Sequence, residues 1–523
     1  MTKPKRSKLT IFLMKEEVKT LDAVIRLDKA NLHRIHFGEF GTLFIRKSQD
    51  GPPEWIEGFF GGMLDGREWF GSSVSAALIV PVEVEEGIVR QFALTFGYGR
   101  TWLEDDAIER RFGLKCVLND VEHDSLRQIK KTLLSGTARK SKEQMPRKST
   151  ITDFSLDYEQ DLLEGVSANG KKGNVLEGAV SGADSLSLSA PVDLINAADY
   201  LKEVYRVYHS DSYKKRFSWI DHVSPVKDKA LIASLEAAAV DSLNAKDESV
   251  WFSIPEVIEW ENIAGFRYTP KGKTFDDILT NDLLETVNND LREFKQLKTK
   301  RVYAISSVDD EIVNSWRANR CLYGELQIGS RQYCVTDGLW YQIDKEYADE
   351  IQQDYEMTAV TSIILPDYGE GCRGEAAYNE AFANSSEFYL LMDQKNILFG
   401  GGRDRIELCD ILSIDGKFIH VKRYGGSSVM SHLFNQGLVS MNLIKTEPRF
   451  IVKANQKIAE LDASGKFSVE KDRAHEVVFG IVTKDKGDFP RIPFFSKVAF
   501  HHVKKRLISM GVEVSIGAIH EVA

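Results

Sequence analysis

The chain has 523 residues and a formal net charge of −10; 43% of the residues are hydrophobic and 28% are charged. This composition is ordinary for a globular protein of several domains, and the negative charge argues against a surface uniformly covered by nucleic acid. There is no run of about 18 apolar residues, and charged residues interrupt the N-terminal segment too early for a signal peptide, so we expect a cytoplasmic protein without a membrane span. The five cysteines lie far apart, which favours reduced thiols over disulfides or a zinc site.

The first predicted domain, residues 1–138, is rich in strands. Turns that contain Gly, Pro or Asp separate the apolar runs at residues 9–14, 41–46, 75–82 and 90–97. The following stretch, residues 139–149, is basic and polar and contains Pro146. Such a composition is typical of a linker or an exposed basic loop, so we expect a domain boundary here.

The second predicted domain, residues 150–365, mixes helices and strands. Apolar residues recur at helical spacing over residues 196–209, 228–243 and 276–297. Strand-like segments follow at residues 301–305 and within residues 315–343. The latter segment contains Tyr333, Trp340 and Tyr341, which could stack on nucleic-acid bases but more commonly would belong to a core.

The third predicted domain, residues 370–523, carries charged residues on consecutive short elements. We expect helices over residues 374–382 and 427–444, and strands over residues 388–392, 397–399, 405–412 and 418–423. Asp410 lies on one of these strands and Lys422 on the next, with a short turn between them.

In the strand over residues 418–423, period-two alternation places Phe418, His420 and Lys422 on one face. A carboxylate on the preceding strand can therefore meet a histidine and a lysine across the hairpin. Metal-dependent phosphodiester cleavage uses such a cluster, because oxygen ligands hold a hard cation while a lysine stabilises charge at the phosphate.

The order of these elements resembles the α-β-β-β-α-β core of the PD-(D/E)XK nuclease superfamily. The resemblance covers residues 370–450, with residues 449–452 as the expected last core strand. It implies an α+β multidomain protein, in which a strand-rich N-terminal domain and a mixed α/β middle domain precede a C-terminal restriction-endonuclease-like core.

The resemblance also implies roles for individual residues. By position, Asp410 matches the acidic metal ligand and Lys422 matches the catalytic lysine. Glu375 matches the acid often found on the first helix, with Glu380 as its substitute. Gln436 matches a polar residue of the following helix. The expected catalytic residues are therefore Lys422, Asp410, Glu375 and Gln436.

His420 stands where the superfamily usually has Glu or Asp. A neutral imidazole can bind a divalent metal and suits Mn²⁺ better than Mg²⁺. The expected metal ligands are thus Asp410, His420 and one of Glu375 or Glu380, and the expected cofactor is Mg²⁺ or Mn²⁺. Glu407 is an alternative ligand, although alternation along an unbroken strand would place it on the opposite face from Asp410.

Basic residues are concentrated in the same part of the chain. Residues 403–523 contain 19 Lys and Arg against 14 Asp and Glu, so the rest of the chain is strongly acidic. A locally basic surface suits a site that meets phosphate. The cations expected to contact a nucleic-acid backbone are Arg403, Arg405, Lys417 and Arg423.

On segments such as residues 94–100 and 406–437, the wider chain resembles a sporadically distributed bacterial family of the kind associated with mobile elements and anti-phage defence. Together the resemblances imply a metal-dependent nuclease, with DNA as the expected substrate, that acts against phage or foreign DNA. One alternative is a catalytically inactive nucleic-acid-binding sensor that signals to a partner protein, and another is a protein-interaction scaffold. A homo-oligomer or a partner protein from a defence system is compatible with these functions.

Overall fold

The computed structural model describes residues 6–26, 32–47, 73–135, 139–287, 290–369, 371–399, 404–462 and 464–522. The chain forms two compact units: unit 1 comprises residues 1–132, 141–157 and 162–220, and unit 2 comprises residues 133–140, 158–161 and 221–523. The chain enters unit 2 for the last time after residue 220, and the domain bounds expected from the sequence stay a prediction. Among the described residues, no helix combines the length and the apolarity needed to cross a membrane.

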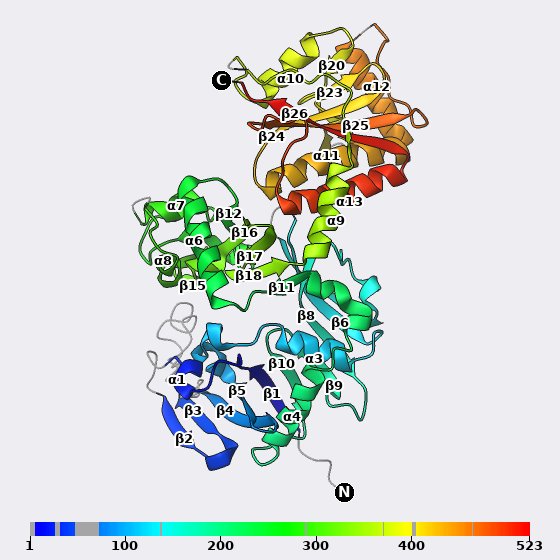
Figure 1. Cartoon of the computed structure of the whole chain (residues 1–523). Coiled ribbons are helices and arrows are strands. Elements are labelled where there is room, and N and C mark those ends of the chain that lie inside the picture. Colours follow the sequence, from blue (N-terminus) through cyan, green and yellow to red (C-terminus); the bar gives the residue numbers. More distant parts are fainter. Residues whose placement is uncertain are drawn as a thin grey trace, which may run out of the picture. The chain divides into compact units, whose positions relative to one another are not determined.

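Unit 1 is organised by a ten-stranded sheet with the strand order β2-β3-β4-β5-β1-β10-β9-β8-β6-β7 (Figure 1). Its strands are β1 (Ser7–Leu13), β2 (His33–His36), β3 (Thr42–Lys47), β4 (Val74–Glu85), β5 (Ile88–Phe96), β6 (Leu126–Leu133), β7 (Arg139–Ser149), β8 (Asp161–Gly170), β9 (Gly178–Gly182) and β10 (Leu186–Ala190). The first strand joins the two halves of this sheet, because β1 pairs with β5 on one side and with β10 on the other.

Alternation along β1 creates two apolar faces. Leu9 and Ile11 belong to a core that includes α3 (Phe112–Asp120) and α4 (Ala197–Tyr208). Phe12 and Met14 belong to a second core with residues around α1 (Leu21–Val24). Helix α4 confirms the helix predicted over residues 196–209, and a single helical turn, α5 (Lys214–Phe217), follows it.

The basic stretch predicted as a linker or loop is instead β7, at one edge of the sheet. Proline is tolerated on an edge strand because its missing N–H can face the unpaired side, which accounts for Pro146. The exposed Lys142, Arg147 and Lys148 of this strand disfavour pairing with a further strand. The linker prediction was wrong because edge strands and linkers share a polar, basic composition.

The first part of unit 2 contains two small antiparallel sheets over a shared core, in the orders β11-β18-β17-β16-β12 and β13-β14-β15. Their strands are β11 (Val223–Pro225), β12 (Val250–Phe252), β13 (Ile263–Arg267), β14 (Arg301–Ser306), β15 (Ile312–Arg317), β16 (Leu322–Ile328), β17 (Arg331–Thr336) and β18 (Leu339–Ile343). Tyr333, Trp340 and Tyr341 are all buried, so these aromatic residues serve the core and not base stacking.

The helix predicted over residues 228–243 is confirmed as α6 (Lys229–Ala245), which the Asp228 carboxylate caps. The helix predicted over residues 276–297 is wrong in its centre, because α7 (Thr280–Glu285) and α8 (Lys295–Thr299) are separate. Asn244, near the end of α6, bonds both the N–H and the C=O of Leu291, at 3.2 and 2.8 Å. These two hydrogen bonds hold Leu291 outside a helix.

The rest of unit 2 is built on a six-stranded sheet in the order β19-β26-β25-β24-β23-β20. Its strands are β19 (Ala359–Val360), β20 (Tyr389–Leu391), β23 (Ile411–Ser413), β24 (Lys417–Arg423), β25 (His475–Thr483) and β26 (Val512–His520). Strands β20, β23 and β24 are antiparallel neighbours, whereas β24, β25 and β26 run parallel. A separate antiparallel pair consists of β21 (Ile397–Phe399) and β22 (Asp404–Ile406).

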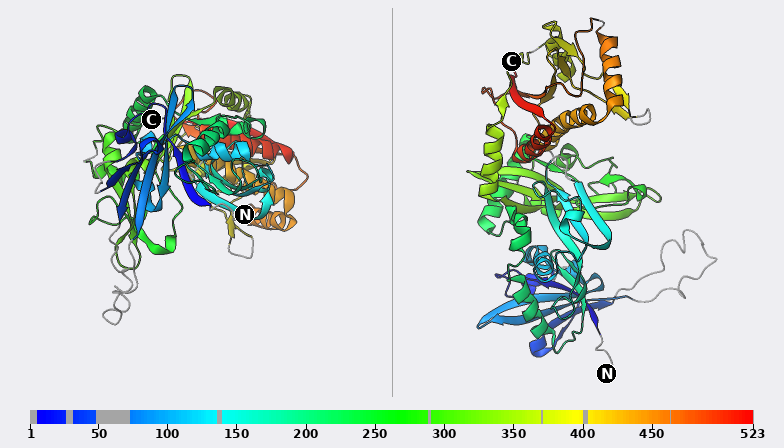
Figure 2. Two further views of the ribbon diagram at one scale, coloured as in Figure 1. Left: turned by 90° about the horizontal axis from the view of Figure 1, so that it is seen from below. Right: turned by 90° about the vertical axis from the view of Figure 1, so that its right-hand side faces the viewer.

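Helices cover both faces of this six-stranded sheet (Figure 1). On one face, Tyr378 of α10 (Glu375–Asn384) shares a core with Val421 of β24. On the other face, α11 (Ser427–Thr446) and α13 (Phe494–Ser509) lie side by side over Phe479 of β25, as the second view in Figure 2 also shows. Helix α9 (Lys345–Glu356) precedes β19, and α12 (Pro448–Leu461) follows α11.

Residues 449–452, expected as the last core strand, lie in α12, and β25 takes that place in the sheet. Pro448 suits the first turn of a helix, and Phe450, Ala454 and Ile458 recur at a spacing of four and are buried. The prediction was wrong because a short apolar run alone does not distinguish a strand from a helix.

Gly437 allows α11 to approach the sheet closely, since a β-carbon at this position would lie 2.9 Å from the buried ring of Phe479. We expect Gly437→Ala to lower the free energy of unfolding by about 1–2 kcal/mol, because overpacking outweighs the helix propensity that alanine adds. Urea denaturation measures this change, with the exposed Asn435→Ala on the same helix as a control that shifts stability by less than about 0.5 kcal/mol. A stabilised Gly437→Ala variant would contradict the close packing of α11.

Candidate functional site

The candidate site lies where β23 and β24 separate. Ile411 pairs with Ile419 in the ladder, and the Asp410 N–H donates to the Ile419 carbonyl at 3.0 Å. Further along β24, the Val421 N–H donates to Asp410 Oδ2 at 2.6 Å. A side chain has thus taken the place of a strand carbonyl, and the Asp410 carboxylate occupies the gap between the strands.

Three carboxylates gather at this gap. Asp393, Glu407 and Asp410 each offer an oxygen within 4.8 Å of the others. Asp393 follows β20, and its N–H donates to the Asp410 carbonyl at 2.9 Å. Gln394, which has a left-handed φ of 60°, donates its N–H to Glu407 Oε1. The turn after β20 is therefore bonded to both acidic residues of the segment before β23.

Lys422 and Glu375 form an ion pair beside these carboxylates. Glu375 is the first residue of α10, and its Oε2 accepts from Lys422 Nζ at 2.8 Å. Its other oxygen, Oε1, accepts from the backbone N–H of Arg423 at 3.0 Å. The Lys422 and Glu375 side chains are 29% and 33% exposed, so a substrate in solvent can reach both.

The carboxylates repel one another in a partly buried setting. Burial, together with the charges of Glu407, Asp393 and Glu375, raises the pKa of Asp410 to about 8. Burial also raises the pKa of Glu407; Asp393 adds to this effect and Lys422 opposes it. A bound proton or cation therefore relieves repulsion at this site.

The donor set fits a hard divalent cation. The three clustered residues offer carboxylate oxygens only, which Mg²⁺, Mn²⁺ and Ca²⁺ prefer over nitrogen or sulfur ligands. Arranged in this way, Asp393, Glu407 and Asp410 could hold such an ion, and Lys422 could contact an anionic substrate beside it.

His420 lies apart from this cluster. Its side chain is 3% exposed, its ring centroid is 6.1 Å from that of Phe479, and its Nε2 has no hydrogen-bond partner among the described residues. Burial is the cause that lowers the pKa of His420 to about 4, so the imidazole is neutral at pH 7. The structure thus brings Asp393 and Glu407 to Asp410, and it leaves His420 in the apolar layer that Phe479 shares with α11.

The other predicted site residues are spread over the same part of unit 2. Glu380 is exposed on α10, Gln436 is half-buried on α11, and Arg405 is exposed on β22. Lys417 pairs with Glu476 at 2.9 Å, and Arg423 pairs with Glu521. Arg403 lies outside the described residues.

The break between β22 and β23 explains why alternation did not predict the cluster. Residues 407–410 do not continue a strand, so period two does not separate Glu407 from Asp410. The adjacent apolar residues Leu408 and Cys409 give no signal of this break, because a strand that is covered on both faces carries such pairs too. Asp393 carries no signal of this kind either, because its position near Asp410 depends on how the turn after β20 folds back onto residue 410.

The raised pKa of Asp410 predicts a dependence of stability on pH. Between about pH 4 and pH 8 the folded protein holds this proton more tightly than the unfolded chain, so the contribution of Asp410 to stability falls as pH rises. Without divalent ions, we expect Asp410→Asn to exceed the wild type in stability by about 1–3 kcal/mol at pH 8 and to match it near pH 4. A tenfold change in acidity is worth about 1.4 kcal/mol, and relaxation of the site removes part of the effect.

Unfolding measured in EDTA across this pH range tests the expectation. Asparagine keeps an acceptor for the Val421 N–H, so the substitution removes only the ionisable group. Asp472→Asn, at an exposed position of the same unit, is the control and should follow the wild-type pH profile. Parallel profiles for wild type and Asp410→Asn would contradict the raised pKa.

Comparison with curated proteins found no match, and comparison with solved structures found none either. The model of the DUF6119 family, described as a family of unknown function, matches residues 9–520. This match covers nearly the whole chain and includes every residue of the acidic cluster. The chain therefore belongs to the DUF6119 family.

Proposed function

We propose that this protein is a metal-dependent nuclease whose catalytic part is a PD-(D/E)XK-like core in unit 2. The order α10, β20, β23, β24, α11, β25, with β25 parallel to β24, supports such a core. Asp410 directly precedes the second of these strands, and Lys422 belongs to the third. The observation that carries the proposal is that Lys422 bonds Glu375 and lies within electrostatic reach of Glu407, while the N–H of the preceding residue, Val421, bonds the Asp410 carboxylate.

In this proposal, Asp393, Glu407 and Asp410 hold Mg²⁺ or Mn²⁺ through their carboxylate oxygens. A divalent ion bound there supplies positive charge to a phosphate and lowers the pKa of a water. Lys422 donates a hydrogen bond to a phosphate oxygen or orients the attacking water, and Glu375 holds its ammonium group in position. This set differs from the one expected from sequence, because Asp393 and Glu407 take the places of His420 and of the ligand expected from Glu375 or Glu380.

A polar hollow of about 570 Å³, lined in part by Arg423, the residue after Lys422, supports an anionic substrate. Its lining includes Arg423 at the carboxyl end of β24, Lys484 just after β25 and Arg491 of the following loop, together with the carboxylates of Asp485 and Glu521. Ligands of open sheets with parallel strands commonly bind at such ends. These three cations suit the backbone of a nucleic acid, whereas Lys417 lies at the opposite end of β24 and pairs with Glu476. Gln436 stays a candidate for substrate contact.

DNA as the substrate, and a role in bacterial defence against phage or foreign DNA, rest on the resemblances of the sequence. The same resemblances are the reason to expect a partner protein from a defence system or a homo-oligomer. The chemistry of the acidic cluster applies equally to DNA and RNA, so both substrates belong in the first assay.

Substitution of Lys422 tests the proposed catalytic role. We expect wild-type protein to cut DNA or RNA in Mg²⁺ or Mn²⁺, and Lys422→Ala to cut at least about 100-fold more slowly, because a charge-stabilising donor is lost. Asp410→Asn should lose activity as well, and EDTA should abolish cleavage by the wild type. A time course on a gel measures the rates.

Lys471→Ala, at an exposed lysine of the same unit, is the matched control and should cut at the wild-type rate. Circular dichroism and the unfolding midpoint establish that each variant is folded. Undiminished cleavage by a folded Lys422→Ala variant would remove Lys422 from the site.

His420 favours a second candidate function, a catalytically inactive sensor that binds nucleic acid and signals to a partner. A buried neutral imidazole stands at the position where the superfamily usually has a metal-binding carboxylate. This candidate predicts salt-sensitive retention of DNA with no product in any divalent ion. The same gel assay, run with a filter-binding assay at two salt concentrations, separates the two functions.

A further inference from the structure

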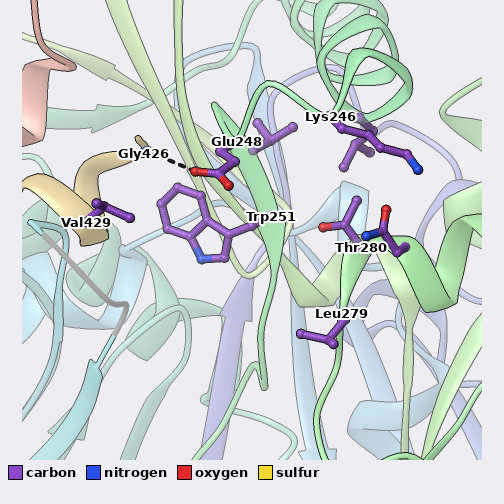
Figure 3. Close-up of a pocket in the computed structure, with 10 residues that line it drawn as sticks. Lys246, Glu248, Trp251, Leu279, Thr280, Gly426 and Val429 are labelled. Carbon is purple, nitrogen blue, oxygen red and sulfur yellow. Dashed lines mark hydrogen bonds between the residues drawn. The ribbon is translucent and has the colours of Figure 1, made fainter. Parts of the chain in front are cut away.

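Unit 2 contains another hollow, of about 400 Å³, that the proposed cleavage reaction does not use (Figure 3). Its volume lies within the roughly 300–1,000 Å³ of small-ligand sites. Three segments contribute to its wall: the end of α6 with β12, the start of α7, and the start of α11. We call this hollow the Trp251 pocket.

The apolar part of the Trp251 pocket offers a flat surface. The half-buried indole of Trp251 stands at its centre, with Val429 of α11 on one side (Figure 3). Leu243 and Val250 are buried beneath it. The planar aromatic ring of a ligand can stack on such an indole, while the aliphatic side chains around it exclude water from the ring.

The polar part of the pocket can recognise the edge of a ring. Thr280 and Asn281, at the start of α7, line the wall and offer a hydroxyl and an amide. Lys246 adds an exposed ammonium group on the side of the indole where Thr280 lies (Figure 3). An amide, which has donors and an acceptor, is suited to the hydrogen-bonding edge of a nucleobase, and an ammonium group is suited to a phosphate.

The backbone beside the pocket is unusual. Lys246 has the left-handed conformation that commonly ends a helix, here α6, whereas Glu248, with φ of 64°, has such a conformation away from a helix end. The Glu248 carboxylate accepts from the N–H of Gly426 at 3.2 Å, just before α11 begins. Residues held in such conformations cluster at ligand sites, because the surrounding structure must fix them.

The pocket adjoins the proposed catalytic site through one short segment. Arg423 and Tyr424 line the polar hollow, and Gly426 lines the Trp251 pocket. Tyr424 is also within electrostatic reach of Asp485 in the polar hollow and of Glu248 in the pocket, since both carboxylates add to the effect of burial in raising the pKa of its phenol. A strand whose phosphates lie in the polar hollow could therefore direct a base into the pocket.

We propose that the Trp251 pocket binds one unpaired nucleobase of the nucleic-acid strand on which the neighbouring site acts. The base stacks on Trp251, Thr280 and Asn281 bind its edge, and Lys246 contacts a neighbouring phosphate. This inference rests on the proposed function, because the strand is the same one. Binding a base outside the stack favours single-stranded, distorted or mismatched substrate.

A fluorescent base provides the test. Full-length protein in Ca²⁺ is titrated with a single-stranded oligonucleotide that contains 2-aminopurine; anisotropy gives the affinity, and emission of the analogue reports stacking. We expect binding to quench the emission, and Trp251→Ala to lose the quenching and to bind at least about fivefold more weakly, as removal of a base-stacking ring does elsewhere. Trp251→Phe should retain most of both signals.

Trp260→Ala is the matched control, because Trp260 is a 57% exposed tryptophan of the same unit that does not line the pocket. Cleavage in Mn²⁺ is measured separately with the same proteins. Equal affinity and equal quenching for wild type and folded Trp251→Ala overturn the base site, even if both proteins cut. Quenching that depends on Trp251 supports the base site. If such quenching is observed but neither the wild type nor any variant cuts, the base site stands and the proposed cleavage function fails.

Discussion

The hydrogen bond from the Val421 N–H to the Asp410 carboxylate is the interaction on which the candidate site depends. It ends the pairing of β23 with β24, while β24 stays paired with β25 along its whole length, from residue 417 to residue 423. Lys422 is thus attached to a fixed strand beside an open gap. Because sites carried by rigid strands hold their geometry better than sites on loops, this arrangement favours precise chemistry. The same bond orients this carboxylate against the repulsion of Glu407 and Asp393.

Packing on both faces of the sheet protects that geometry. Helix α10 brings Glu375 to the strand end, and α11 continues from the loop that follows Lys422. The two helices have separate cores, and Met392, Leu408 and Cys409, which lie next to the clustered carboxylates in the chain, belong to the core beneath α11. The proposed cation would have to compete with the proton that Asp410 holds at neutral pH, so its binding would release that proton. Near neutral pH the site therefore responds through its own carboxylates, because the imidazole of His420 is already neutral there.

Sequence periodicity predicted the elements that carry local signals. The strand bearing Lys422, the helix beginning near Glu375 and the helix after residue 427 all lie where alternation or helical spacing puts them. Periodicity does not predict elements whose conformation depends on residues far away in the sequence. Whether residues 139–149 form an edge strand depends on a distant partner, and the break at residues 407–410 depends on the turn that carries Asp393. On the sequence alone, His420 is predicted to lie at the metal, because alternation shows which face of the strand a side chain occupies but not which element packs on that face. Here α11 covers the face that carries His420.

The position of β1 has a consequence for biosynthesis. Ser7 pairs with Ala190, so one edge of this central strand has no partner until the ribosome has translated almost 200 residues. At roughly 5–20 residues per second, the delay is on the order of 10–40 s. During that interval Leu9 and Ile11 lack part of the core that later covers them. A nascent chain of this kind is a natural client for a ribosome-associated chaperone. Chains truncated before residue 190 should stay incompletely folded, because β1 then lacks its partner β10.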